Sequence, residues 1–372
     1  MNARPVLVAA APSSPTQNRH HAVQAVQRVR PDFVPTDLLR HTSKTIVMSG
    51  SVGPQQVVAK VLVDRGPFWR DKFDREVGMY RAFTRHAPPV RVPRLVDADA
   101  PAGVLVLERL TGRRLADDRY PAGPVPADDI TAVLDAVASL ARWEPPMPLS
   151  GWDYRERVER DYRAGLLDDD DHRALAVLLA QAGSRRCFAH GDLLPSNVRL
   201  LADSGEPGQV ALLDWEFAGL YLPGFDLALL WVLLGAVSPA RHLIDTRIAA
   251  ADPQTRAAFT VNQALVFTRE LRIHHEASPG RWRERRLSTL TRDWTAFRAQ
   301  TLHPAGRHNA RRPLARRGRE RARQRREDHP GQAPRPPIRR PRSRPAGRLR
   351  RPVGGSETSG PGRMVVPLGP DR

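Results

Sequence analysis

Polar residues in the middle of the chain have the types and the spacing that phosphoryl transfer needs. His190, Gly191, Asp192 and Asn197 form the pattern H-G-D-x-x-x-x-N, and Asp214 follows after a further apolar run. Carboxylate and amide oxygens are the hard ligands that Mg2+ takes, usually together with nucleotide phosphates. The reaction depends on positioning and charge neutralisation more than on covalent help from the protein. These residues can supply both if the fold brings them together.

The segments around the motif predict a hairpin that would do so. An apolar stretch and two strand-like runs surround it, at residues 187–189, 198–201 and 210–213. A turn-rich segment, residues 204–208, joins the two runs. Such a hairpin returns Asp214 to the loop that precedes its first strand. We therefore expect Asp192, Asn197 and Asp214 to converge.

Three motifs together resemble those of a known family. The H-G-D-x-x-x-x-N pattern is followed by Leu213-Asp214-Trp215-Glu216 and by Asp226-Leu227-Ala228. In this combination the chain resembles the aminoglycoside phosphotransferase and choline kinase family of small-molecule kinases. It departs from the protein-kinase pattern H-R-D at Gly191, which stands in the place of Arg.

The resemblance implies an α+β, protein-kinase-like fold with two lobes. A small nucleotide-binding lobe with an antiparallel sheet is expected at residues 21–107, followed by a hinge at 108–112. A mainly helical, catalytic large lobe is expected at 113–300. Residues 1–20 are expected to be a disordered leader, and residues 301–372 a disordered tail rich in Arg and Pro.

The resemblance also implies an activity, which is ATP-dependent transfer of the γ-phosphate to a hydroxyl group of a small molecule, with ATP and Mg2+ as cofactors. Asp192 would draw the hydroxyl proton, whereas His190, the second candidate catalytic residue, would orient the loop by hydrogen bonding. Asp226 would brace the loop from below. Metal ligands are implied at Asn197, Asp214 and Glu216.

The small lobe contains a candidate pair for the nucleotide phosphates. Lysine occurs only at positions 44, 60 and 72, against 56 arginines. Lys60 lies on the second of two predicted strands, residues 45–48 and 55–63, where the family's lysine contacts phosphates. Glu76 lies in a predicted helix, residues 71–84, and would aim the Lys60 ammonium. The alternative is a surface lysine and an ordinary helix-face glutamate.

Two further nucleotide contacts follow from the resemblance. The phosphate-covering loop would contain Thr42 and Ser43, although it has no glycine; a loop containing Gly50 and Gly53 is the alternative, though a simple hairpin turn suits those two better. Backbone groups of the hinge would bind the adenine edge, at Glu108 and Leu110.

Charge is distributed unevenly along the chain. The formal net charge is +19, and residues 301–372 carry 20 Arg, no Lys and 5 acidic residues. The remaining 300 residues are therefore nearly neutral, and they are enough for a fold of two lobes. The single cysteine, Cys187, cannot form an internal disulfide, which suits a reducing compartment. No apolar run reaches the length of a membrane span, and we expect a cytoplasmic protein.

The basic tail leaves two interpretations open. It can bind nucleic acid or an anionic surface by counterion release, which would make the chain a catalytically retired kinase-like fold acting through its tail. It can also be the product of a shifted reading frame in a gene rich in G and C. Retirement of the fold is disfavoured by the retention of Lys60, Asp192, Asn197 and Asp214.

The acceptor stays open between an aminoglycoside-like antibiotic, an amino alcohol and a sugar-like compound. Six arginines between residues 269 and 286 weigh against a polycation, and a neutral or anionic hydroxyl compound fits as well. The acidic run at residues 168–171 resembles a metal site. Its position at the start of a predicted helix, residues 171–182, favours a helix cap instead.

Overall fold

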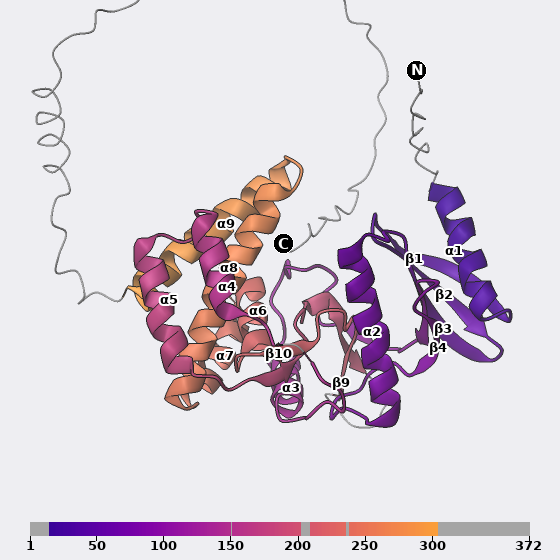
Figure 1. The fold of residues 1–372 in the computed structure, drawn as a ribbon, viewed down its shortest axis with the longest axis horizontal. Helices are drawn as coiled ribbons and strands as arrows, with labels where there is room; N and C mark the ends of the chain where they lie inside the picture. The colour runs from indigo at the N-terminus through magenta and orange to yellow at the C-terminus, as the bar shows by residue number, and fades with distance from the viewer. Residues whose placement is uncertain (1–14, 150, 202–208, 236–237, 304–372) are drawn as a thin grey trace, which may run out of the picture. The chain divides into compact units, whose positions relative to one another are not determined.

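The computed structural model of the protein describes residues 15–149, 151–201, 209–235 and 238–303. An antiparallel sheet with two helices comes first, and a mainly helical lobe follows it (Figure 1). The turn predicted at residues 204–208, residues 1–14 of the predicted leader and residues 304–372 of the predicted tail lie outside the described residues. The predicted start of the tail at residue 301 is wrong, because a π-helix, Arg298–Leu302, continues past it and Leu302 is buried.

The small lobe is built on a five-stranded sheet in the order β1-β2-β3-β5-β4, with every neighbouring pair antiparallel. Its strands are β1 (Phe33–His41), β2 (Thr45–Val52), β3 (Gln55–Leu62), β4 (Leu95–Asp99) and β5 (Val104–Glu108). Gly50 lies within β2 and pairs with Val57, whereas Gly53 takes the tight turn to β3 with a φ of 55°. The two glycines therefore belong to a hairpin, as their closeness to Lys60 predicted.

Alternation along the inner strands decides which side chains lie on each face of the sheet. In β5, Val104 and Val106 pack on the side of α1 (Pro15–Val29), whereas Leu105 and Leu107 pack on the side of α2 (Pro67–Arg85). The two helices cover opposite faces of the sheet (Figure 1). Successive residues of a strand point to opposite faces. In β3, Ala59 is buried on the α1 side, so Lys60 points toward α2.

The boundary of the predicted leader is wrong, because α1 already begins at Pro15 and includes residues 15–20. Residues 17–21 are polar and are exposed or half-buried. The first turns of this helix therefore contribute no apolar residue to the core, and they lack the periodic pattern by which a helix is recognised.

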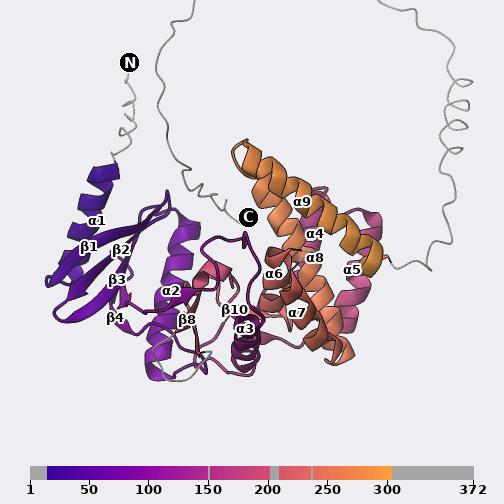
Figure 2. The ribbon, with the colours of Figure 1, turned by 180° about the vertical axis from the view of Figure 1, so that it is seen from behind.

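The large lobe contains seven further α-helices among the described residues: α3 (Ala127–Leu140), α4 (Tyr154–Arg163), α5 (Asp169–Ala182), α6 (Phe225–Leu234), α7 (Pro239–Ala249), α8 (Pro253–Glu276) and α9 (Arg281–Phe297). The view from behind shows α8 passing among α4, α6 and α9 (Figure 2). Short strands complete the lobe: β6 (Arg113–Arg114), β7 (Cys187–Ala189), β8 (Val198–Leu201), β9 (Gln209–Leu212) and β10 (Gly219–Tyr221). No described helix is both long enough and apolar enough to cross a bilayer.

The acidic run at residues 168–171 caps a helix, as predicted. The Asp168 side chain accepts hydrogen bonds from the backbone N–H groups of Asp170 and Asp171, and the Asp171 carboxylate accepts one from the Asp168 N–H. Arg298 also pairs with both carboxylates. His303 lies 3.0 Å from the Asp171 carboxylate as well, so backbone donors, one guanidinium and one imidazole surround this charge.

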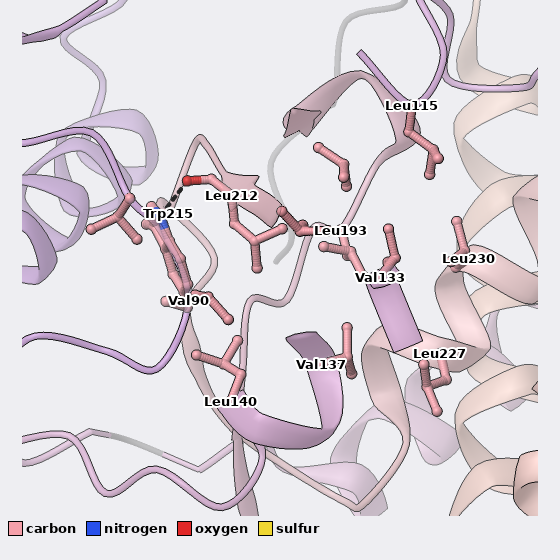
Figure 3. Close-up of a cluster of buried hydrophobic side chains, with 14 of the residues drawn as sticks. Val90, Leu115, Val133, Val137, Leu140, Leu193, Leu212, Trp215, Leu227 and Leu230 are labelled. Atoms are coloured by element: carbon pink, nitrogen blue, oxygen red, sulfur yellow. Dashed lines mark hydrogen bonds between the residues drawn. The ribbon is translucent and has the colours of Figure 1, made fainter. Parts of the chain in front are cut away.

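A buried cluster holds the loop that carries Asp214 in place. Val133, Val137 and Leu140 of α3 pack with Leu227 and Leu230 of α6 around the residues next to the motif (Figure 3). Trp215 is fully buried in this cluster, and its Nε1–H donates to the Leu212 carbonyl at 3.1 Å. Because Trp215 is fixed, its neighbours Asp214 and Glu216 are fixed as well.

Candidate active site

The predicted hairpin exists and brings the ends of its strands together. β8 and β9 are antiparallel, with Val198 opposite Leu212. The Leu213 N–H donates to the Asn197 carbonyl at 2.9 Å, which places the residue before Asp214 beside the end of the motif. Asp214 itself has a φ of 70°, a positive value that no other non-glycine residue of the described chain adopts. Such strain is typical of functional sites.

The loop between β7 and β8 is held by one buried carboxylate. Asp226, at the start of α6, accepts the N–H of His190 at 2.8 Å and the N–H of Gly191 at 2.9 Å. Burial raises the pKa of Asp226, and the neighbouring His190 ring and these two backbone donors partly offset that effect. This arrangement agrees with the bracing role expected of Asp226.

Gly191 is required by the geometry of this loop. Its φ is 79°, and a Cβ atom there would lie 2.1 Å from the Phe217 carbonyl oxygen and 2.7 Å from the Tyr221 hydroxyl. No side chain fits in that space. The replacement of Arg by Gly in the H-R-D pattern is therefore a consequence of the close approach of the Phe217 backbone.

His190 positions the loop through both ring nitrogens. The side chain is fully buried; its Nδ1 accepts the Asp192 N–H at 3.3 Å, so its Nε2 carries the proton that it shares with the Leu213 carbonyl at 2.9 Å. The Asn197 amide donates to the Asp192 carbonyl at 3.1 Å. Both of these hydrogen bonds of the His190 ring go to backbone groups, and the catalytic role of Asp192 stays a prediction.

Lys60 lies at the centre of three carboxylates. Its ammonium is 2.6 Å from Asp214, 2.7 Å from Glu76 and 3.2 Å from Glu216. Residues separated by more than 150 positions therefore meet, and Lys60 and Glu76 are not the surface pair of the alternative reading.

The charges of this cluster shift one another's pKa values. Burial alone would lower the pKa of Lys60, but the three carboxylates raise it well above its ordinary value. Lys60 outweighs burial at Asp214 and lowers its pKa, whereas burial raises the pKa of Glu216. Burial raises the pKa of Glu76 to about 8, against the opposing effect of Lys60. The cluster therefore carries more acid than its single cation can neutralise.

The donor set of this cluster fits a divalent cation. Oxygens of Glu76, Asp214 and Glu216 all lie within 4.8 Å of one another. Asn197 uses its amide N–H on the Asp192 carbonyl, so its side-chain oxygen is the atom that a cation would take. Carboxylate and amide oxygens are the ligands that Mg2+ prefers. Glu76 was not among the ligands predicted from the sequence.

The turn between β1 and β2 brings a further lysine to the site. The Thr42 hydroxyl is used within the turn, where it accepts the N–H groups of Lys44 and Thr45, and Ser43 is exposed. Lys44 lies 3.7 Å from the centre of the Trp69 ring. Burial lowers the pKa of Lys44 to about 8, and the nearby carboxylates of Glu216, Asp192 and Asp214 oppose that shift. Lys44 stands in the predicted phosphate-covering loop, residues 41–44, but it was not among the predicted nucleotide contacts.

The predicted hinge is anchored by ion pairs. The Glu108 carboxylate binds Arg91 at 2.7 Å and Arg94 at 3.3 Å, and the Glu108 N–H donates to the Arg94 carbonyl. Neither its side chain nor its amide is therefore a nucleotide group. Leu110, two residues on, is half-buried. Adenine recognition at Leu110 and at the Glu108 carbonyl stays a prediction.

Asp192 has a cationic partner that the sequence did not reveal. Arg269, on α8, contacts its carboxylate at 2.5 Å, and both side chains are largely buried. Arg269 also lies 3.6 Å from the buried Glu270, which Arg119 binds through two hydrogen bonds of 2.9 and 2.6 Å. No motif spacing links α8 to the catalytic loop, so only the fold could identify this contact.

Comparisons with known proteins agree with this geometry. A family model described as "phosphotransferase enzyme family" matches residues 55–261. The GDP and kanamycin complex of APH(2")-IIia superimposes with a TM-score of 0.53 at 14% identity, covering 76% of this chain and 99% of that one. The GDP complex of wild-type aminoglycoside 2'-phosphotransferase-IIIa gives 0.54 at 14% identity, with 75% and 99% coverage. A search of curated proteins found no sequence match. The predicted α+β, two-lobed, protein-kinase-like fold is confirmed.

Proposed function

The chain belongs to the phosphotransferase enzyme family, and we propose from this premise that it transfers the γ-phosphate of ATP to a hydroxyl group of a small molecule. The observation that carries the proposal is the contact of 2.6 Å between Lys60 and Asp214, with Glu76 at 2.7 Å from the same ammonium. It joins the nucleotide lysine of the small lobe to the acidic loop of the large lobe.

Asp192 is the group that acts on the acceptor. Its carboxylate takes the proton of the acceptor hydroxyl while the hydroxyl oxygen bonds to the γ-phosphorus and the bond to ADP breaks. His190 accepts the Asp192 N–H, Asp226 holds the backbone of His190 and Gly191, and Arg269 orients the Asp192 carboxylate. Atoms and charge balance, because the proton leaves the acceptor and the electron pair of the broken bond leaves with ADP.

The acidic cluster prepares the nucleotide side. Asp214 and Glu216, with Asn197, would hold Mg2+, which neutralises phosphate charge when bound. Lys60 would then point at the phosphates, aimed by Glu76. Lys44 would add a second cation from the turn between β1 and β2. The resemblance expects the hydroxyls and backbone N–H groups of Thr42 and Ser43 there, but both groups of Thr42 bond within the turn, so only Ser43 would contribute donors.

The proposal is tested by ADP release from the full-length protein and its Asp192→Ala variant. Removing a general base lowers kcat by roughly 10²–10⁴-fold. Asp135→Ala is the matched control, because Asp135 is an exposed carboxylate on α3 whose partner, Arg247, lies outside the site. Equal ADP release by wild type and Asp192→Ala would overturn the proposal.

The competing function, a retired fold that binds nucleic acid or an anionic surface through its tail, gives a different result. It predicts no dependence of any activity on Asp192 and a strongly salt-dependent DNA affinity that is lost on truncation after residue 303. The charge imbalance at Lys60 argues against it, because a fold retained for binding alone has no use for three carboxylates on one cation.

A further inference from the structure

A pocket beside Asp192 is lined by residues from α2, α4, α8 and the segment around β10. Gly191 and Arg269 both line it, and Arg269 contacts the Asp192 carboxylate, so the pocket lies next to that carboxylate. Its cavity volume is about 100 Å³, and it is partly open to solvent. A space of this size takes one functional group of a small ligand rather than a whole drug-sized molecule.

The charge of this pocket is of one sign. Among the described residues that line it, five are cations and none is a carboxylate; the cations are Lys72, Arg75, Arg157, Arg269 and Arg272. A cleft lined by one sign of charge focuses its field and concentrates ligands of the opposite sign.

The cations of the pocket have interaction partners outside its lining. Asp192 and Glu270 interact with Arg269, but Glu270 is fully buried behind the pocket and also serves Arg119. Arg75 and Arg272 have partners on their own helices, Asp71 and Glu276, at 3.5 Å. Those partners are at least half exposed, and exposed pairs of this kind are weak and screened.

The walls between the cations are aromatic. Tyr221 and Phe225 stack with ring centres 4.2 Å apart, Arg157 lies over the Trp152 ring at 5.0 Å, and Lys72 lies 4.6 Å from the Phe217 ring centre. Apolar walls with a few polar groups are typical of ligand sites. The rings suit a carbon skeleton, and the cations suit an oxyanion.

Resting on the function proposed above, we propose that the phosphate acceptor is a hydroxyl compound that carries a carboxylate or phosphate group. Arg75 and Arg272 would bind that oxyanion, since a guanidinium matches carboxylate and phosphate geometry. Arg269 would link the bound acceptor to Asp192. A polycation of the kanamycin kind would meet five like charges in the same space, which weakens its binding.

The test is calorimetric binding to the full-length protein carrying Asp192→Ala, so that no turnover is needed. The probes are glucose, gluconate, glucose 6-phosphate, glucosamine and kanamycin. We expect both anions to bind at least about tenfold more tightly than glucose, and both amines to bind more weakly than glucose. The order of gluconate and glucose 6-phosphate distinguishes a carboxylate site from a phosphate site.

A pair of double variants separates the pocket from the rest of this basic chain. Arg75→Gln/Arg272→Gln should weaken anion binding by roughly 10–100-fold and leave glucose unchanged. Arg85→Gln/Arg281→Gln removes the same charge from exposed positions outside the pocket and should change anion binding less than about twofold. The affinity for Mg2+ and ATP should be the same in both.

Three results would overturn the inference: tighter binding of either amine than of gluconate, no binding of either anion, or equal weakening by the two double variants. Each can be told apart from failure of the proposed function, which is measured by ADP release with intact Asp192. Selective anion binding without Asp192-dependent ADP release would support the anion-binding pocket and contradict the proposed phosphotransferase activity.

Discussion

Two charged regions meet at Asp192, and they are opposite in sign. Around Lys60, three carboxylates share one ammonium, which leaves an excess of acid in a buried place. In the pocket beyond Arg269, five cations line one cavity. Excess acid suits a divalent cation that accompanies a nucleotide, whereas excess base suits an anion. These opposite charges indicate that a metal-bound nucleotide belongs beside Lys60 and that an anionic acceptor belongs in the pocket beyond Arg269.

The largest effect should come from removing the only ammonium of the acidic cluster. Lys60→Met leaves Glu76, Asp214 and Glu216 facing one another, and loss of one partner of a buried ion pair costs roughly 3–5 kcal/mol. Urea unfolding measures this loss, and added Mg2+ should recover part of it by binding the folded state. Lys72→Met is the control from the basic pocket, with an expected loss below about 1 kcal/mol. Equal losses of unfolding free energy in Lys60→Met and Lys72→Met would contradict the contrast between the acidic cluster and the basic pocket.

The pH dependence of stability should reveal the excess acid. The pKa of Glu76 is about 8 in the folded protein against an ordinary 4.5, so the folded state keeps a proton that the unfolded state releases in that window. Stability should therefore fall as pH rises from 4.5 to 8, by roughly 2–4 kcal/mol in wild type. Glu76→Gln should remove most of this slope in urea unfolding curves recorded across the window. An unchanged slope would show that Glu76 is not the titrating group.

The loop at the boundary of the two regions should tolerate no side chain. Gly191→Ala would place a Cβ atom 2.1 Å from the Phe217 carbonyl oxygen, whereas Gly53→Ala has the same sign of φ and no neighbour within 4 Å. We expect Gly53→Ala to cost about 1 kcal/mol, and Gly191→Ala to cost about 2 kcal/mol more, with loss of ADP release. Similar losses of stability for Gly191→Ala and Gly53→Ala in thermal unfolding would mean that the Phe217 backbone can move to accommodate a Cβ atom.

The smallest effect concerns Lys44, whose surroundings assign it to the acidic side. Lys44→Met should raise KM for ATP roughly fivefold, equivalent to about 1 kcal/mol, with little change in kcat. Its pKa of about 8 means that wild type loses this charge as pH rises above 8. Lys44→Arg should keep ATP affinity in that range, because Arg stays charged. If KM for ATP is equally independent of pH above 8 in wild type and in Lys44→Arg, Lys44 does not contact the nucleotide.

The acidic side could be predicted from the sequence because its residues lie in short motifs with fixed spacing. Asp192, Asn197 and Asp214 are ordered by one hairpin, and Lys60 by the alternation of one strand. The hydroxyl of Thr42 and the amide of Glu108 were expected to face a nucleotide, but the turn and the hinge use them internally. The residue types alone do not predict those hydrogen bonds.

The basic side could not be predicted, because three helices far apart in the chain build it. α4 was not predicted, because its buried residues include the charged Arg157 and Asp161 and the helix therefore lacks the periodic apolar pattern of an amphipathic helix. α7 was missed because Ala240, Arg241 and Ile244 are its buried residues, too few to mark a face. Strand β1 is mostly exposed and contains Pro35, so it lacks alternation. Clustered arginines were visible in the sequence, but their meeting at Asp192 was not.

The position of Trp215 affects whether the small lobe can be expressed without the large lobe. Its ring packs against Phe83 of α2, with ring centres 4.8 Å apart, and against Phe188 and His190 of the large lobe. The aromatic core is thus shared across the hinge and belongs to neither lobe alone. A fragment ending at residue 112 would present Phe83 and its neighbours to water, so we expect it to aggregate when expressed by itself.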